Sequence, residues 1–169
     1  METRAPEHTP GTAPTTEETT ALLAQLRGTH DAYADLAATY SEEAMHRQPA
    51  PGEWSGVQTI AHIADLDLFY RTERFNLMLM EDAPTLPLYD PDARMAAGNF
   101  AVMTTAEALD FMKTERDALL MLLEGLRPHE WARVGVHPER GPKTLYELAA
   151  SLVGHGEMHM GQLRAAAGS

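Results

Sequence analysis

Residues 144–167 read TLYELAASLVGHGEMHMGQLRAAA, and the fold of this chain can be worked out from this stretch. Leu145, Leu148 and Leu152 recur at steps of three and four, which places their side chains along one stripe of an α-helix. The helix is expected to begin at Thr144. We therefore predict one long amphipathic helix over the whole stretch.

Three further stretches have the same helical period and are separated by segments rich in proline and glycine. We predict helices over about residues 17–46, 56–81 and 105–125, and a short helical turn over about 92–98. Residues 127–142 are expected to form a loop. No alternating run of useful length predicts a β-strand, so we expect an all-α fold, a four-helix bundle.

The length of 169 residues is that of one domain. Residues 1–16 contain three prolines, five threonines, one glycine and no apolar residue larger than Met1. Such a segment cannot bury apolar surface, so we predict a disordered tail over 1–16 and the bundle domain over 17–169.

The composition excludes several classes of protein. There is no cysteine, which rules out disulfides, thiolate zinc sites and iron–sulfur clusters. Thirteen Lys and Arg against 25 Asp and Glu give a net charge of −12, which argues against binding to nucleic acid or to anionic membranes. No run is long and apolar enough to span a bilayer and no secretion signal is visible, so we expect a cytoplasmic protein.

Two histidines in the fourth predicted helix stand out. His155 and His159 are four residues apart, so their rings project from one face of the helix and can reach a single cation. Glu157 stands two positions after the first histidine, which does not fit the His-Glu-x-x-His motif of zinc proteases. We reject the protease interpretation.

A metal site would need a third ligand. His62 is the candidate, because it lies within the second predicted helix beside the apolar residues Ile60 and Ile63. The alternative interpretation of His62 is a core histidine hydrogen-bonded to a backbone carbonyl, and for His62 taken in isolation this alternative is favoured.

The chain resembles the DinB/YfiT-like superfamily of metalloenzymes from about residue 17 to the C-terminus. The resemblance is carried by Trp54-Ser55, His62-Ile-Ala-Asp65, Glu130-Trp131-Ala-Arg133, His137-Pro-Glu-Arg-Gly141, Thr144-Leu145, His155-x-x-x-His159 and Gln162-Leu163. It implies a four-helix bundle of unusual connectivity, often dimeric. It also implies one divalent metal, commonly zinc or nickel, held by His62, His155 and His159.

Three neutral imidazoles without a thiolate suit zinc, nickel, iron or copper and select poorly among them. The resemblance favours zinc or nickel, with iron, manganese or copper as further candidates. Three protein ligands leave a position open for chemistry. Several characterised members of this superfamily look like S-transferases that use low-molecular-weight thiols such as bacillithiol or mycothiol. The resemblance therefore implies such a thiol as cosubstrate and a small electrophilic molecule as substrate. We therefore expect a metal-dependent S-transferase or hydrolase, and a homodimer is the assembly that the resemblance implies. A non-catalytic metal- or ligand-binding bundle is the alternative.

Two polar residues are candidates to support the ligands. Gln162 follows His159 by three residues and could orient a ligand ring, or it could be an ordinary solvated glutamine. Asp65 follows His62 by three residues and could accept a ring proton, although a surface carboxylate is the simpler interpretation.

Other residues near these motifs have simpler interpretations. Trp54 is expected to be a packing anchor, and His137, which precedes a proline, an exposed loop residue outside the metal shell. Arg71 and Arg74 could bind an anionic group of a substrate, but arginines on an acidic surface more often pair with carboxylates.

Overall fold

A computed structural model of the chain describes residues 12–168, so most of the tail predicted over 1–16 lies outside the described residues. In chain order the elements are α1 (Thr16–Ala37), α2 (Glu42–His46), α3 (Gly56–Phe69), the π-helix η1 (Tyr70–Phe75), α4 (Asn76–Met80), α5 (Pro91–Gly98), the 3-10 helix η2 (Phe100–Val102), α6 (Thr105–Glu124), α7 (Pro128–Trp131), β1 (Val134–His137), β2 (Gly141–Thr144) and α8 (Leu145–Ala167).

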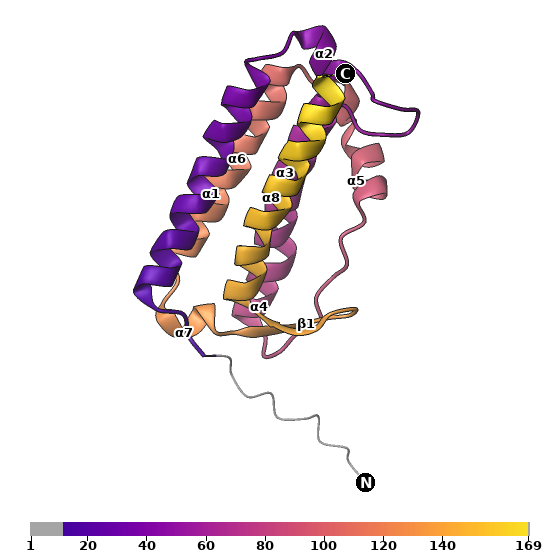
Figure 1. The fold of residues 1–169 in the computed structure, drawn as a ribbon. Helices are drawn as coiled ribbons and strands as arrows, with labels where there is room; N and C mark the ends of the chain where they lie inside the picture. Colours follow the sequence, from indigo (N-terminus) through magenta and orange to yellow (C-terminus); the bar gives the residue numbers. More distant parts are fainter. Residues whose placement is uncertain (1–11, 169) are drawn as a thin grey trace.

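The four long helices α1, α3, α6 and α8 form a bundle (Figure 1). Both α1 and α3 pack against α6 and α8, so α1 and α3 stand on one diagonal and α6 and α8 on the other. In the view of Figure 1, the chain ascends α1, descends α3 and α6, and ascends α8. Because α3 and α6 run in the same direction, the segment 81–104 must return along the whole bundle. We call this segment, which contains α5 and η2, the crossover segment.

All four long helices begin with the same local device, a Ser or Thr cap whose hydroxyl accepts a backbone N–H while a Glu or Gln three residues later bonds back to the backbone of the cap. The four pairs are Thr15 with Glu18, Ser55 with Gln58, Thr104 with Glu107, and Thr144 with Glu147. Such caps stabilise a helix by about 1 kcal/mol each and fix where it starts.

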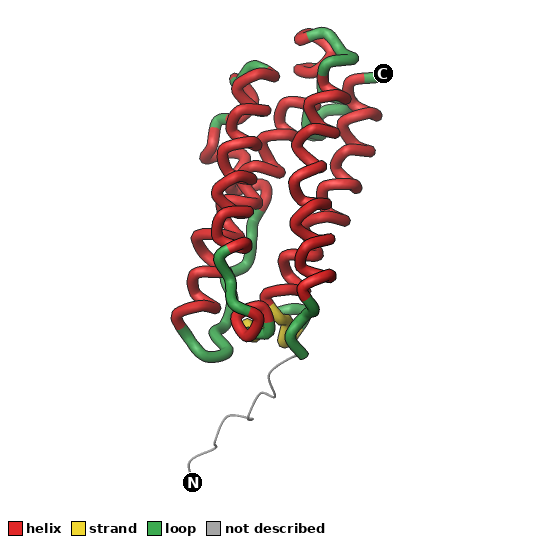
Figure 2. Tube along the Cα trace, turned by 90° about the vertical axis from the view of Figure 1, so that its left-hand side faces the viewer, coloured by secondary structure: helices red, strands yellow, loops and turns green. Residues whose placement is uncertain are grey.

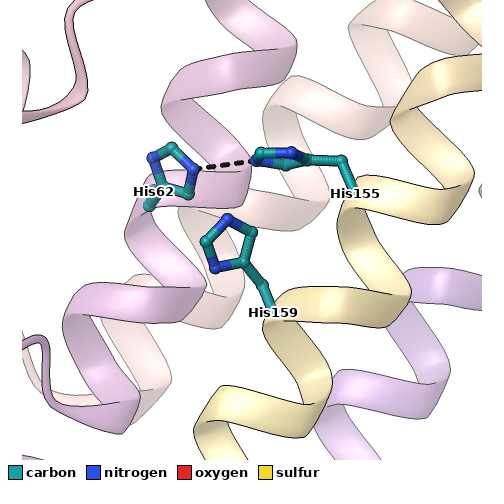
Figure 3. Close-up of side chains that lie close together, drawn as sticks. All are labelled: His62, His155 and His159. Carbon is teal, nitrogen blue, oxygen red and sulfur yellow. Dashed lines mark hydrogen bonds between the residues drawn. The ribbon is translucent and has the colours of Figure 1, made fainter.

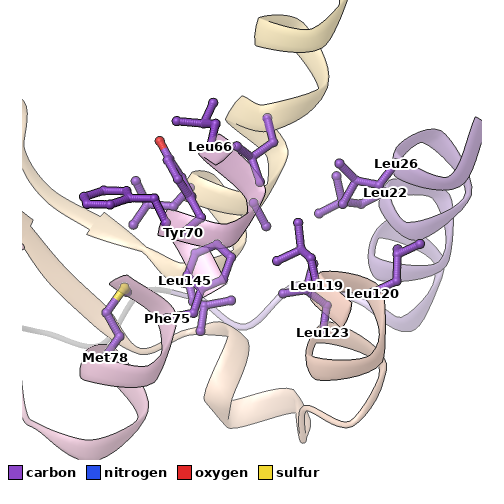
Figure 4. Close-up of a cluster of buried hydrophobic side chains, with 14 of the residues drawn as sticks. Leu22, Leu26, Leu66, Tyr70, Phe75, Met78, Leu119, Leu120, Leu123 and Leu145 are labelled. Carbon is purple, nitrogen blue, oxygen red and sulfur yellow. The ribbon is translucent and has the colours of Figure 1, made fainter. Parts of the chain in front are cut away.

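Apolar side chains fill the bundle in two main clusters. One lies at the end near α4 and α7 (Figure 4), and the other fills the end near α2. A buried ion pair crosses the bundle interior: Arg116 on α6 donates to both carboxylate oxygens of Asp67 on α3, at 2.6 and 3.2 Å. Its third bond, to the carbonyl of Leu26, ties α1 to the same pair.

The first helix is shorter than the sequence predicts. It ends at Ala37 instead of near residue 46, and α2 follows as a separate helix. The reason is local: the Thr39 hydroxyl donates to the carbonyl of Leu36, and Ser41 accepts from the amide of Ala44 as the cap of a new helix. Side chains that compete with the helical backbone in this way end one helix and start another.

The segment 127–142, expected to be a loop, contains α7 and the first strand of an antiparallel hairpin, β1–β2. Figure 2 shows this hairpin at one end of the bundle. It is too short for a recognisable alternating pattern, and contacts distant in sequence support it. The amide of Leu86 donates to the carbonyl of Val136, and the amide of Val136 donates to the carbonyl of Pro84. The fold class itself, a four-helix bundle, is confirmed.

Within residues 12–168, none of the helices combines the length and the apolar character that crossing a lipid bilayer requires.

Candidate metal centre

Three histidine rings from two helices converge at the middle of the α3–α8 contact (Figure 3). His62 projects from α3, while His155 and His159 project from successive turns of α8. One potential ligand nitrogen from each ring lies within 4.8 Å of the others, and the Nε2 atoms of His62 and His155 are 3.0 Å apart. Within the described residues, no other histidine or carboxylate joins this cluster.

A hydrogen-bond relay sets the tautomer of His62. The Tyr89 hydroxyl donates to Oδ2 of Asp65 at 2.8 Å and lies 3.1 Å from Nδ1 of His62. Since the hydroxyl has one proton and gives it to the carboxylate, it must accept the second bond, so Nδ1 of His62 carries hydrogen. The lone pair of His62 is therefore on Nε2, the nitrogen that faces the other two rings.

Gln162 plays the same part for His159. Nδ1 of His159 lies 2.6 Å from Oε1 of Gln162, and an amide oxygen only accepts, so Nδ1 carries the proton. The remaining nitrogen, Nε2, points toward His62 and His155 (Figure 3). Gln162 is therefore one of the two supporting residues that the sequence indicates, and it is held next to a ligand candidate.

Burial keeps the three rings neutral. Burial, together with the neighbouring rings of His159 and His155, lowers the pKa of His62 to about 3. Burial lowers the pKa of His155 to about 4, and also lowers that of His159. Neutral imidazoles with free lone pairs are the form that binds metal ions.

The donor set fits a divalent metal ion. With Nε2 of His62 unprotonated, its 3.0 Å contact with Nε2 of His155 is satisfied either by a proton on His155 or by one cation shared between the two nitrogens. Nδ1 of His155 has no hydrogen-bond partner among the described residues, so this ring is free to move its proton there. Two imidazole nitrogens on one zinc ion lie roughly 3–4 Å apart, given Zn–N bonds of about 2.0–2.1 Å.

The cluster opens onto a pocket of about 380 Å³. Its walls come from α3, α8, residues 88–91 of the crossover segment and residues 137–140 of the hairpin. This volume lies within the range of small-molecule sites. Since one wall is the crossover segment and another the hairpin, the two irregular parts of the fold both contribute to the site.

Asp65 is buried and is not the surface carboxylate of the simpler interpretation. Only 4% of it is exposed, and besides Tyr89 it accepts from Arg94 Nε and Nη2 at 2.5 and 2.7 Å. Asp65 thus acts on His62 through Tyr89 instead of accepting the ring proton directly. Tyr89 and Arg94 were not identified from the sequence, because both belong to the crossover segment, whose placement has no local sequence signal.

One further expectation about the site is wrong, and another is confirmed but incomplete. His137 is buried, because β1 and the crossover segment enclose it, although it does remain outside the three-histidine cluster. Trp54 is a wall of the pocket as well as a packing residue, with its ring centroid 4.7 Å from that of His62 and 6.0 Å from that of His159. The start of α3, only six residues before His62, was a signal that could have placed Trp54 there.

A glycine lets α8 approach α1 beside the cluster. A Cβ on Gly156 would lie 3.2 Å from the Thr29 methyl group, and the Gly156 carbonyl accepts from the Tyr33 hydroxyl at 2.8 Å. This close approach offsets the cost of about 1 kcal/mol that a glycine brings to a helix interior. It also fixes the turn of α8 that carries both His155 and His159.

The fold and the cluster together define the class of protein. It is a four-helix bundle in which three histidines are placed where they could hold one metal ion. The chain belongs to the DinB superfamily, whose family model matches residues 25–163. Among solved structures, it is similar to YfiT from Bacillus subtilis, described as "a probable metal-dependent hydrolase with an unusual four-helix bundle topology". The TM-score is 0.78 at 19% identity, over 95% of this chain and 90% of that one. No curated protein matches the chain.

We predict that the metal-free protein loses stability as the pH falls below about 6.5, the ordinary histidine value. The pKa values of His62 and His155 are about 3 and about 4 in the folded chain, so the unfolded chain binds more protons between these values and 6.5. Thermal unfolding of chelator-treated protein between pH 7.5 and 5.5 measures this effect.

The variant His155→Asn is the comparison, because it lacks one of the titrating rings and should show a weaker fall in melting temperature over the same range. Subtracting the two profiles removes the contribution of the groups that His155 does not influence. Identical pH profiles for the variant and the parent chain would contradict the prediction.

Proposed function

We propose that this protein is a metal-dependent enzyme that acts on a small electrophilic molecule, as a hydrolase or as an S-transferase for a low-molecular-weight thiol. The observation that carries this proposal is the convergence of three neutral imidazoles on a pocket of about 380 Å³. His62, His155 and His159 are the proposed ligands, zinc or nickel the proposed ions. The description of YfiT as a metal-dependent hydrolase supports the same class.

A divalent ion held there would act as a Lewis acid and lower the pKa of a nucleophile, either water or a thiol. The residues of this chain prepare the site for that role. Tyr89 and Gln162 hold the Nδ1 protons of His62 and His159, so both rings present Nε2 without rearrangement. Trp54 packs against the rings of His62 and His159.

The choice between water and a thiol as the nucleophile follows from the resemblance and not from geometry. The chain has no cysteine, so a thiol would have to arrive as a cosubstrate. The homodimer remains a prediction from the same resemblance, and the cytoplasmic location remains a prediction from the sequence.

We expect the zinc- or nickel-loaded protein to turn over at least one member of a panel of small electrophiles, such as esters, epoxides and activated alkenes. The panel is assayed with and without low-molecular-weight thiols, against chelator-treated protein. Product that requires the thiol identifies an S-transferase, and product formed in water alone identifies a hydrolase. No turnover above the metal-free control would contradict the enzymatic proposal and favour a metal-binding bundle without activity.

We predict that His155→Ala lowers the zinc content of the purified protein severalfold, because two imidazoles hold a divalent ion much less tightly than three. Elemental analysis after dialysis measures the stoichiometry. His129→Ala is the matched control: this histidine is exposed on α7, away from the pocket, and its removal should leave the zinc content unchanged. An unchanged zinc content in His155→Ala would refute the ligand assignment.

We predict that Tyr89→Phe weakens zinc binding about 10- to 100-fold, the usual effect of removing a group that orients a metal ligand. Without the hydroxyl, Nδ1 of His62 loses its acceptor and the ring is free to adopt the tautomer with hydrogen on Nε2. Competition with a chromophoric chelator measures the affinity. Tyr146→Phe, which lies outside the pocket, is the control. Equal affinities in the two variants would show that the relay does not set the tautomer.

A further inference from the structure

The charge in the pocket is opposite in sign to that of the protein. The chain as a whole carries −12, yet the charged side chains that line the pocket are Arg74, Arg140 and Glu139. Asp65 lies behind the wall and is already neutralised by Arg94. The lining is therefore net positive, even with all histidines neutral and before any metal ion binds.

Arg74 is a buried cation without a carboxylate partner among the described residues. Only 3% of it is exposed, and its guanidinium lies over the rings of Phe69 and Tyr70, 5.2 and 4.7 Å from their centroids. Its hydrogen bonds from Nε and Nη2 go to one carbonyl, that of Pro87. By contrast, the neighbouring Arg71 pairs with Glu115 at 2.7 Å, as arginines on an acidic surface usually do.

The π-helix η1 turns Arg74 toward the pocket. Arg74 follows His62 by twelve residues, which in an uninterrupted α-helix would place the two side chains about 120° apart around the axis. The i→i+5 hydrogen bonds of η1 turn the chain through a smaller angle per residue, so the two come onto the same face. His62, Leu66, Tyr70 and Arg74, four residues apart in succession, accordingly all line the pocket.

His137 adds a second donor beside Arg74. The backbone amide of Glu139 donates to Nδ1 of His137 at 3.2 Å, so the neutral ring carries its proton on Nε2. Nη2 of Arg74 lies 3.4 Å from that same Nε2. Both atoms bear hydrogen, so they do not satisfy each other, and an acceptor between them would receive a hydrogen bond from each.

We propose that Arg74, His137 and Arg140 form an anion subsite that holds the carboxylate or phosphate group of a small organic substrate. Arg74 and His137 supply buried, preorganised donors, and Arg140 adds an exposed positive charge at the mouth. The rest of the substrate lies along Leu66 and Tyr70 and presents its reactive part to the three histidines. The assignment of a reactive end rests on the proposed function, whereas the anion subsite does not require a metal.

The experiment uses the chelator-treated full chain and three probes of similar length: hexanoate, hexyl phosphate and the neutral hexanamide. Isothermal titration should show tighter binding of at least one of the two anions than of the amide. Arg74→Gln should weaken binding of that anion at least fivefold and leave the amide within twofold. Arg71→Gln, which removes a paired arginine outside the pocket lining, should change neither.

Whichever anion binds more tightly identifies the group that the subsite accepts. Equal binding of both anions and the amide to the parent chain would overturn the proposal, and so would parental anion affinity in Arg74→Gln.

Arg140→Glu keeps the test decisive should Arg74→Gln fail to fold, because Arg140 is exposed and makes no hydrogen bond or ion pair with the described residues. This reversal of charge should weaken anion binding at least threefold and leave amide binding unchanged, and an unchanged anion affinity would overturn the proposal.

The zinc content of each variant is measured in parallel. Loss of anion binding with normal zinc content separates this subsite from the metal site, and failure of zinc binding alone leaves the subsite standing.

Discussion

The site depends on the hydrogen bonds that the carboxylate of Asp65 accepts. This carboxylate lies on α3, one turn from His62, and receives hydrogen bonds from Tyr89 and Arg94 of the crossover segment. These bonds hold a long, irregular segment against the bundle and so build one wall of the pocket. Through Tyr89 they also decide which nitrogen of His62 bears hydrogen. One buried carboxylate thus couples the shape of the pocket to the state of a proposed ligand.

The electrostatic design of the pocket differs from that of the surface. The chain as a whole carries a net charge of −12, whereas the pocket lining offers two arginines, one glutamate and uncharged imidazoles. Arg74 is positioned by the π-helix η1. Such helices are rare overall, and those that occur are often found at functional sites. The local irregularity therefore has a chemical role, which is to bring a cation onto the face that a regular helix would turn away.

The four long helices and the pairing of His155 with His159 were predictable because both depend on short-range periodicity. Leucine spacing located the four long helices, and the i, i+4 spacing of His155 and His159 placed two rings on one face; the match of His62 came from the resemblance. Tyr89, Arg94 and His137 escaped prediction because the crossover segment and the hairpin bring them to the site from far along the chain. Where each of these lies is decided by contacts such as Leu86 with Val136, which no local pattern encodes.

The pairing of α3 with α8 has a consequence for biogenesis. His62 and His155 are 93 residues apart in sequence, and the helix that carries His155 and His159 is the last of the four bundle helices to be synthesised. An emerging chain that lacks α8 presents only His62, a lone imidazole with weak hold on any ion. Loading of the proposed ion must therefore follow completion of the whole bundle, and occupancy would report that a newly made molecule has reached its final topology.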